Sequence, residues 1–147
     1  MSQAPDWSAL LTMLPHQYPL RLIDEVRDYS PGEFLTASFR PAKLRPYCGD
    51  KDEIPPTILI EGLAQTCVIM TQLETEPLAD GEMPLLGAVK ARIACPVYWD
   101  QLLLYKVNPV RIWAKKAIFS GVLYGPDGKI AVTADLSVAV TNEATIK

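Results

Sequence analysis

The chain has 147 residues, of which 49% are hydrophobic and 21% charged, and these proportions are typical of one folded domain. Fourteen basic against seventeen acidic residues give a net charge of −3, which argues against binding nucleic acid or an anionic membrane by bulk charge. No apolar run approaches the ~20 residues of a spanning helix, and no basic-then-apolar secretion signal is present. We therefore expect a single domain over residues 1–147, located in the cytoplasm.

The cysteines and the single histidine exclude several kinds of site. Cys48, Cys67 and Cys95 are odd in number and widely spaced, so they predict neither a disulfide framework nor a zinc site. His16 is the only candidate to activate a serine or cysteine nucleophile. Because prolines flank it, we expect this histidine to anchor a turn rather than to catalyse. The sequence also lacks a glycine-rich phosphate loop, and no metal or cofactor is expected.

The elements expected before the centre of the chain are a helix over 7–14 and strands over 20–26 and 34–39. Asp6 can cap the helix and Pro15 ends it. A turn over 30–33 joins the two strands. Residues 40–56 are interrupted by prolines and a glycine and carry several charges, so they predict a loop.

Residues 56–70 form the most informative segment. Pro56 suits the first turn of a helix, where a missing N–H is harmless. The segment is apolar nearly all round, so we expect a helix that is enclosed by protein on every side. Glu61 and Gln65 lie four residues apart and therefore share one stripe of this helix.

The rest of the chain predicts a meander of four strands, at residues 84–94, 101–113, 116–124 and 129–141, after a polar loop over 77–82. A Gly-Pro-Asp-Gly turn joins the last two strands. The order of two strands, a buried helix and four strands predicts an α+β fold, with an antiparallel sheet around a central helix. Such a sheet leaves one face to cover, which favours a dimer.

Glu61 is the strongest candidate for chemistry. A carboxylate among apolar neighbours is suited to general acid or base work. The alternatives are a structural ion pair with Arg92 or a lysine, or exposure to solvent at the start of the helix. Cys67 lies in the apolar part of the same helix, and we interpret it as a small buried hydrophobe.

Three stretches in order resemble the 3-hydroxyacyl-acyl-carrier-protein dehydratases over about residues 12–141. They are Leu-Pro-His-Gln-Tyr-Pro at 14–19 with Leu-Ile-Asp at 22–24, residues 55–59 with Glu-Gly-Leu-Ala-Gln at 61–65, and Gly-Ala-Val-Lys-Ala-Arg at 87–92 with Cys-Pro-Val at 95–97 and Asp-Gln-Leu at 100–102. The resemblance implies the hot-dog fold, in which a six-stranded antiparallel sheet wraps around one long central helix and dimerises edge to edge.

The resemblance also implies a reaction, the removal of water from a (3R)-3-hydroxyacyl thioester. In that family a loop histidine removes the C2 proton, and a carboxylate on the partner's central helix handles the leaving hydroxyl. A backbone N–H at the start of the helix polarises the carbonyl. Glu61 falls on the carboxylate, but Tyr47 falls on the histidine and Pro56, which has no N–H, falls on the glycine donor. The candidate catalytic residues are thus Glu61 and Tyr47, and the candidate substrate-binding residues are Gln65, Thr57, Pro56 and Cys48.

Three functions stay open at this point, and so does the question of whether the chain is an enzyme. The first is a dehydratase of fatty-acid or polyene-type polyketide biosynthesis with an altered site, although Tyr47 is a poor base because the reference pKa of tyrosine is about 10. The second is a non-catalytic or half-catalytic subunit that binds acyl-ACP or acyl-CoA, as a homodimer or in a heterodimer with a histidine-bearing homologue. The third is a hot-dog thioesterase in which Glu61 activates water.

Overall fold

The computed structural model describes residues 8–14 and 20–142, and the structural statements below concern these residues. His16 lies outside them, as do residue 7 and Pro15 at the ends of the first predicted helix. The remainder of that helix is a 3-10 helix, η1 (Ser8–Met13). No helix in the described part of the chain is long and apolar enough to cross a membrane.

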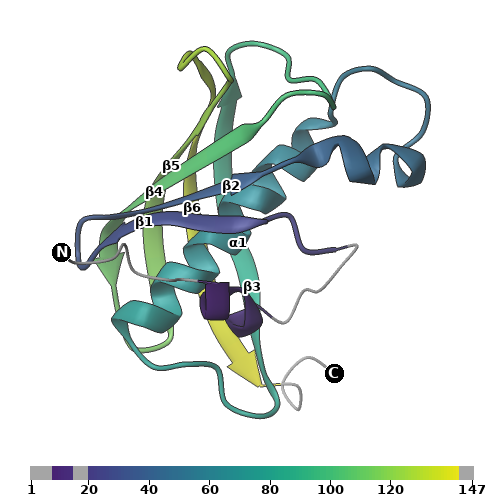
Figure 1. Ribbon diagram of the computed structural model, residues 1–147. Helices are drawn as coiled ribbons and strands as arrows, with labels where there is room; N and C mark the ends of the chain where they lie inside the picture. Colours follow the sequence, from purple (N-terminus) through teal and green to yellow (C-terminus); the bar gives the residue numbers. More distant parts are fainter. Residues whose placement is uncertain (1–7, 15–19, 143–147) are drawn as a thin grey trace, which may run out of the picture.

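One antiparallel sheet of six strands curves around the long helix α1 (Pro56–Glu74) (Figure 1). The strands are β1 (Glu25–Ser30), β2 (Phe34–Phe39), β3 (Glu82–Ile93), β4 (Leu103–Ile112), β5 (Lys116–Tyr124) and β6 (Ile130–Asn142). Their order in the sheet is β1-β2-β4-β5-β6-β3, so β1 and β3 are the two edges. The α+β arrangement predicted from the order of the elements is confirmed.

The helix is enclosed as its composition predicts. Every residue from 62 to 72 is buried, including the polar Gln65, Thr66, Thr71 and Gln72. The hydroxyl of Thr66 donates to the carbonyl of Gly62 at 2.8 Å, which satisfies it within the helix. Pro56 occupies the first turn, and α1 runs four residues beyond the predicted end.

The first predicted strand, over 20–26, overlaps β1 only at residues 25 and 26, because β1 begins at Glu25, so residues 20–24 are not strand. Leu22 and Ile23 are 5% and 0% exposed and belong to the core that surrounds α1. Backbone groups of Leu22 bond to side chains of the helix and of β4 instead of to a neighbouring strand. The apolar run therefore reflects burial against the helix and not pairing in the sheet.

The predicted loop over 40–56 contains a second 3-10 helix, η2 (Pro41–Tyr47). Pro41 occupies its first turn, where proline is tolerated, and Leu44 anchors it by being 4% exposed. Figure 1 shows η2 beside the N-terminal end of α1. The prolines of this segment shape a short helix and do not prevent one.

The two edges of the sheet have different chemistry. β1 is six residues long and exposes charged side chains at Glu25, Arg27 and Asp28. β3 is twelve residues long and exposes large apolar side chains, each between 37% and 43%, at Met83, Leu85, Leu86, Val89 and Ile93. Charge protects an edge strand against pairing, whereas a long apolar edge favours it. The β3 edge is thus the side suited to pairing with another chain.

Candidate functional site

A groove of about 520 Å³ lies at the N-terminal end of α1, and we call it the N-terminal groove. It is lined by Leu20, Leu22, Leu44, Tyr47, Cys48, Thr57, Ile58 and Glu61. The lining is largely apolar, and among the described residues Glu61 is the one charged residue in it. Four of the six predicted site residues, Tyr47, Cys48, Thr57 and Glu61, are thereby brought together.

Three segments of the chain position these residues. The last residue of η2, Tyr47, is 63% exposed and forms the rim of the groove. The start of α1 is fixed by Ile54, which is 3% exposed and whose N–H donates to the carbonyl of Val97 at 2.7 Å. Thr57 then lies exposed in the first turn of the helix, and Glu61 lies half-buried one turn further on.

Pro56 and Gln65 differ from the other predicted residues. Pro56 is exposed at the start of α1 and is not part of the groove lining. Gln65 is 1% exposed, and its side chain bonds within the chain. Its Oε1 accepts from the N–H of Leu22 at 2.8 Å, and its Nε2 donates to the carbonyl of Leu20 at 2.9 Å. A weaker contact of 3.4 Å joins Nε2 to Oε1 of Glu61.

The groove has a continuation along α1. Glu61 also borders a small cavity of about 40 Å³, the neck, whose other lining residues are Ala64, Gln65, Val68, Pro84, Leu85, Leu86 and Val138. Val68, Pro84 and Val138 border in turn a cavity of about 390 Å³ at the C-terminal end of the helix, which we call the C-terminal chamber. One face of α1 thus runs from the groove, past Glu61 and the neck, to the chamber.

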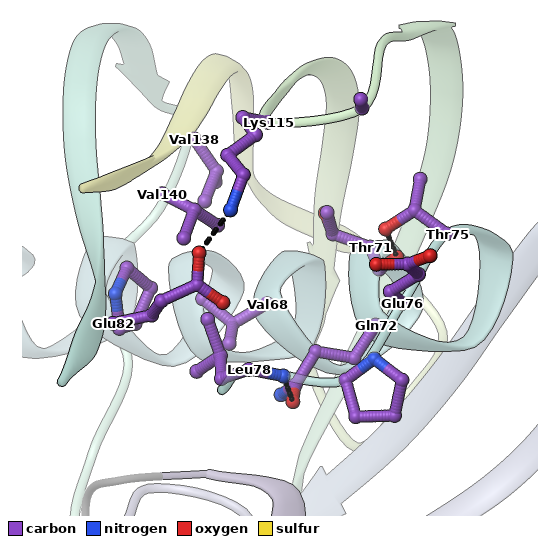
Figure 2. Close-up of a pocket in the computed structure, with 13 residues that line it drawn as sticks. Val68, Thr71, Gln72, Thr75, Glu76, Leu78, Glu82, Lys115, Val138 and Val140 are labelled. Atoms are coloured by element: carbon purple, nitrogen blue, oxygen red, sulfur yellow. Dashed lines mark hydrogen bonds and ion pairs between the residues drawn. The ribbon is translucent and has the colours of Figure 1, made fainter. Parts of the chain in front are cut away.

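Polar and apolar side chains together line the chamber (Figure 2). Glu82 and Lys115 point toward each other and form an ion pair, while Val138 and Val140 lie beside them. On the opposite side, Oε1 of Gln72 accepts from the N–H of Leu78 at 2.8 Å. The hydrogen bond that the Lys115 ammonium group donates to the Glu82 carboxylate lowers the pKa of Glu82, so the pair is ionised at neutral pH.

Two buried groups beside the site are chemically quiet. Burial raises the pKa of the Cys67 thiol and keeps it protonated. Because the side chain is also 0% exposed, Cys67 does not act as a nucleophile. Burial, and secondarily the charge of Asp24, raises the pKa of Tyr105 well above its usual value. The Tyr105 hydroxyl is therefore always a hydrogen-bond donor, and it donates to the carbonyl of Leu22 at 3.0 Å.

Sequence reasoning missed the apolar wall of the groove, formed by Leu20, Leu22, Leu44 and Ile58. The signal for this wall is the apolar run that begins at Leu20, but its local pattern predicts a strand. Tyr105 was also missed, because a tyrosine in a strand of alternating apolar residues carries no local sign of its partner. The described residues contain no group of three or more histidine, cysteine or acidic side chains that could hold a metal.

The chain is similar to known protein families and solved structures. The family described as ApeP-like, ApeP dehydratase, matches residues 8–146. The 3-hydroxyacyl-acyl-carrier-protein dehydratase FabZ of Oleidesulfovibrio alaskensis is 32% identical over 142 residues, which cover 93% of this chain and 92% of the relative. One solved structure is the dehydratase heterocomplex ApeI:P from Xenorhabdus doucetiae, with a TM-score of 0.79 and 20% identity over 92% of both chains.

A mutant thioesterase from Pseudomonas aeruginosa is also similar in structure, with a TM-score of 0.72 and 16% identity over 95% of this chain and 96% of the other. At these identities the similarity to the solved structures is evidence for the fold alone. They confirm the hot-dog fold that the sequence resemblance implied.

Proposed function

Because the chain belongs to the ApeP-like dehydratase family, we propose that its N-terminal groove binds the reacting end of an acyl thioester. Its role is that of a dehydratase-family protein in fatty-acid or polyene-type polyketide biosynthesis. The observation that carries this proposal is the position of Glu61. The carboxylate comes from a buried helix, borders an apolar groove, and is the one charge that the described residues place in its lining.

In the proposed reaction a base removes the proton from C2 of a 3-hydroxyacyl thioester. The electrons of that C–H bond form the C2–C3 double bond, and the C3–O bond breaks. Glu61 gives the leaving hydroxyl a proton, so that water departs. Removal of the proton and polarisation of the carbonyl need two further groups, and in a chain acting alone Tyr47 and the N–H of Thr57, which line the same groove as Glu61, are the candidates for them.

We further propose that this subunit works with a histidine-bearing homologue. The groove lining contains no histidine among the described residues, and Pro56 has no N–H to donate. Tyrosine is a weak base at neutral pH. The β3 edge offers a long apolar surface for pairing, and the similar ApeI:P protein is a heterocomplex. In such a pair Glu61 completes a site whose histidine comes from the partner, with acyl-ACP or acyl-CoA as the substrate and the cytoplasm as the compartment.

The neck and the C-terminal chamber suit the rest of the acyl chain. From Glu61 to Thr75, fourteen residues at about 1.5 Å each, the helix rises about 21 Å. This length accommodates an extended acyl chain of many carbons. A neck of about 40 Å³ suits an unbranched chain better than a branched one. The C-terminal chamber, which lies beyond the neck, then limits the length of the acyl chain that the protein accepts.

A single assay tests the proposal. Crotonyl-ACP and 3-hydroxybutyryl-ACP are given to the purified chain alone and to the chain co-purified with a histidine-bearing homologue. Enoyl absorbance and free thiol are followed together. We expect reversible hydration in the co-purified complex, reduced about 10²–10⁴-fold by Glu61→Gln. Thr66→Val serves as the matched control, since Thr66 is buried on the same helix and bonds only within it.

The other outcomes separate the alternatives. Glu61-dependent hydration by the chain alone would show that Tyr47 or another group replaces the histidine, and the partner part of the proposal would fail. Glu61-dependent release of thiol would make the protein a thioesterase. Full hydration in the complex after Glu61→Gln would contradict the role of Glu61.

A further inference from the structure

The segment 20–22 forms one wall of the N-terminal groove without belonging to a strand. Leu20 and Leu22 both line the groove. The backbone of this segment is held by three hydrogen bonds from side chains, two from Gln65 on α1 and one from Tyr105 on β4. Both the N–H and the carbonyl of Leu22 are thus bonded to side chains that are 1% and 0% exposed. Side chains here replace the partner that a sheet would supply.

These bonds fix the orientation of the Gln65 amide. Because Oε1 accepts from the N–H of Leu22, the NH₂ end must face the carbonyl of Leu20 and the carboxylate of Glu61. In a flipped amide, the NH₂ group of Gln65 would face the N–H of Leu22, and the amide oxygen would face the carbonyl oxygen of Leu20. Neither contact could form a hydrogen bond. Gln65 therefore presents only donor hydrogens to Glu61.

Tyr105 fixes the same segment from the side of the sheet. Its hydroxyl passes under α1 at Gly62, where an added Cβ would lie 2.2 Å from the hydroxyl oxygen. Gly62 directly follows Glu61, so the depth of the helix at the groove depends on this contact. The hydroxyl bonds the carbonyl of Leu22 in a buried setting, 83 residues away in sequence.

We propose that Gln65 and Tyr105 are positioning residues, which together fix the position of the 20–22 wall relative to the Glu61 carboxylate. This inference rests on the proposed function and assigns to Gln65 a task other than the contact with substrate expected from the sequence. Gln65 joins the wall to the carboxylate, and Tyr105 joins the wall to the sheet and to the helix backbone beside Glu61. Displacement of a reacting group by about 1 Å costs on the order of 10²-fold in rate.

The test uses Gln65→Met and Tyr105→Phe, which keep most of the side-chain volume and remove the hydrogen bonds. Thr66→Val is the matched control, because it also removes a buried hydrogen bond on α1 but none to the wall. Hydrogen exchange of the Leu22 amide should accelerate at least about tenfold in Gln65→Met and stay within about twofold in the control. In Gln65→Met, iodoacetamide should also alkylate Cys48 several times faster than in the unsubstituted protein, because Cys48 lines the same groove as Leu22.

Kinetics of the active assembly separate positioning from simple stability. We expect kcat to fall about 10–100-fold in Gln65→Met with a much smaller change in KM, since a misplaced carboxylate affects the reaction more than binding. In the double variant the two losses should be less than additive, because both residues hold Leu22. Unchanged kcat with accelerated exchange would overturn the proposal. If the wild type shows no activity with any partner, the proposed function fails, whereas the exchange and alkylation rates still decide whether the wall is held.

Discussion

The two ends of α1 present opposite environments although one apolar helix supplies both. At the N-terminal groove, the wall segment and η2 bring apolar side chains to a single carboxylate, Glu61. At the C-terminal chamber, the start of β3 and the turn before β5 bring an ion pair, and the end of α1 adds hydroxyl and amide groups. The neck separates the two. Under the proposed function, the groove holds the reacting carbons and the chamber holds the far end of the acyl chain.

The largest loss of stability is expected from a substitution that displaces α1 at the groove end. Gly62→Ala places a methyl group 2.2 Å from the Tyr105 hydroxyl and 2.4 Å from a carbon of its rigid ring, so α1 or β4 must shift. We expect a loss of about 2–3 kcal/mol in the free energy of unfolding, measured by urea denaturation. Gly121→Ala is the control, because its added methyl meets flexible methyl groups at 3.1 Å and beyond and should cost less. Equal losses in both variants would contradict this account of the groove end.

A substitution between the neck and the chamber should act on long chains alone. Val138 borders both cavities and is 2% exposed. Val138→Leu should weaken kcat/KM for a 3-hydroxydodecanoyl thioester about tenfold and leave the 3-hydroxybutyryl thioester within about twofold. Val122→Leu, on β5 and outside this path, provides the control. Equal losses for both substrates would show that the chamber does not hold the chain end.

The three thiols report on occupancy of the groove. Cys48 lines it, Cys95 is half-buried elsewhere, and Cys67 is enclosed. We expect octanoyl-pantetheine to slow alkylation of Cys48 by iodoacetamide several-fold without changing Cys95, as read by mass spectrometry. Cys67 should stay unmodified at pH 8, since burial raises its pKa and keeps the thiol protonated. Equal protection of Cys95 would mean that the ligand binds away from the groove.

The smallest effect is expected from the ion pair of the chamber. Lys115 lowers the pKa of Glu82, so the pair stabilises the fold above the ordinary glutamate pKa, and this contribution is lost as the pH falls through the lowered value. Glu82→Gln should lower Tm by less than about 2 °C at pH 7 and leave it unchanged near pH 2. Asp127→Asn, on an exposed turn with a 3.9 Å ion pair, should have no measurable effect at either pH. An equal Tm difference at both pH values would show that the charge of Glu82 is not responsible.

Much of the groove end could be predicted from short-range pattern. Prolines at the start of an apolar run marked the beginning of α1, and the four-residue spacing placed Glu61 and Gln65 on one stripe. The resemblance to a known family drew attention to Tyr47, Cys48 and Thr57, which the fold brings to the same groove. The chamber could not be predicted, because its walls come from the end of α1, the start of β3 and the turn before β5, which share no local pattern.

The sequence by itself determined that a buried helix carries a carboxylate and an amide one turn apart, because helical periodicity and composition are local properties. Only the tertiary structure decided what these groups do. The bonds from Leu22 to Gln65 and to Tyr105 join residues 43 and 83 positions apart. The same apolar run could pair in a sheet or pack on a helix. That choice depends on which distant side chains offer partners for its backbone, and no short-range pattern encodes it.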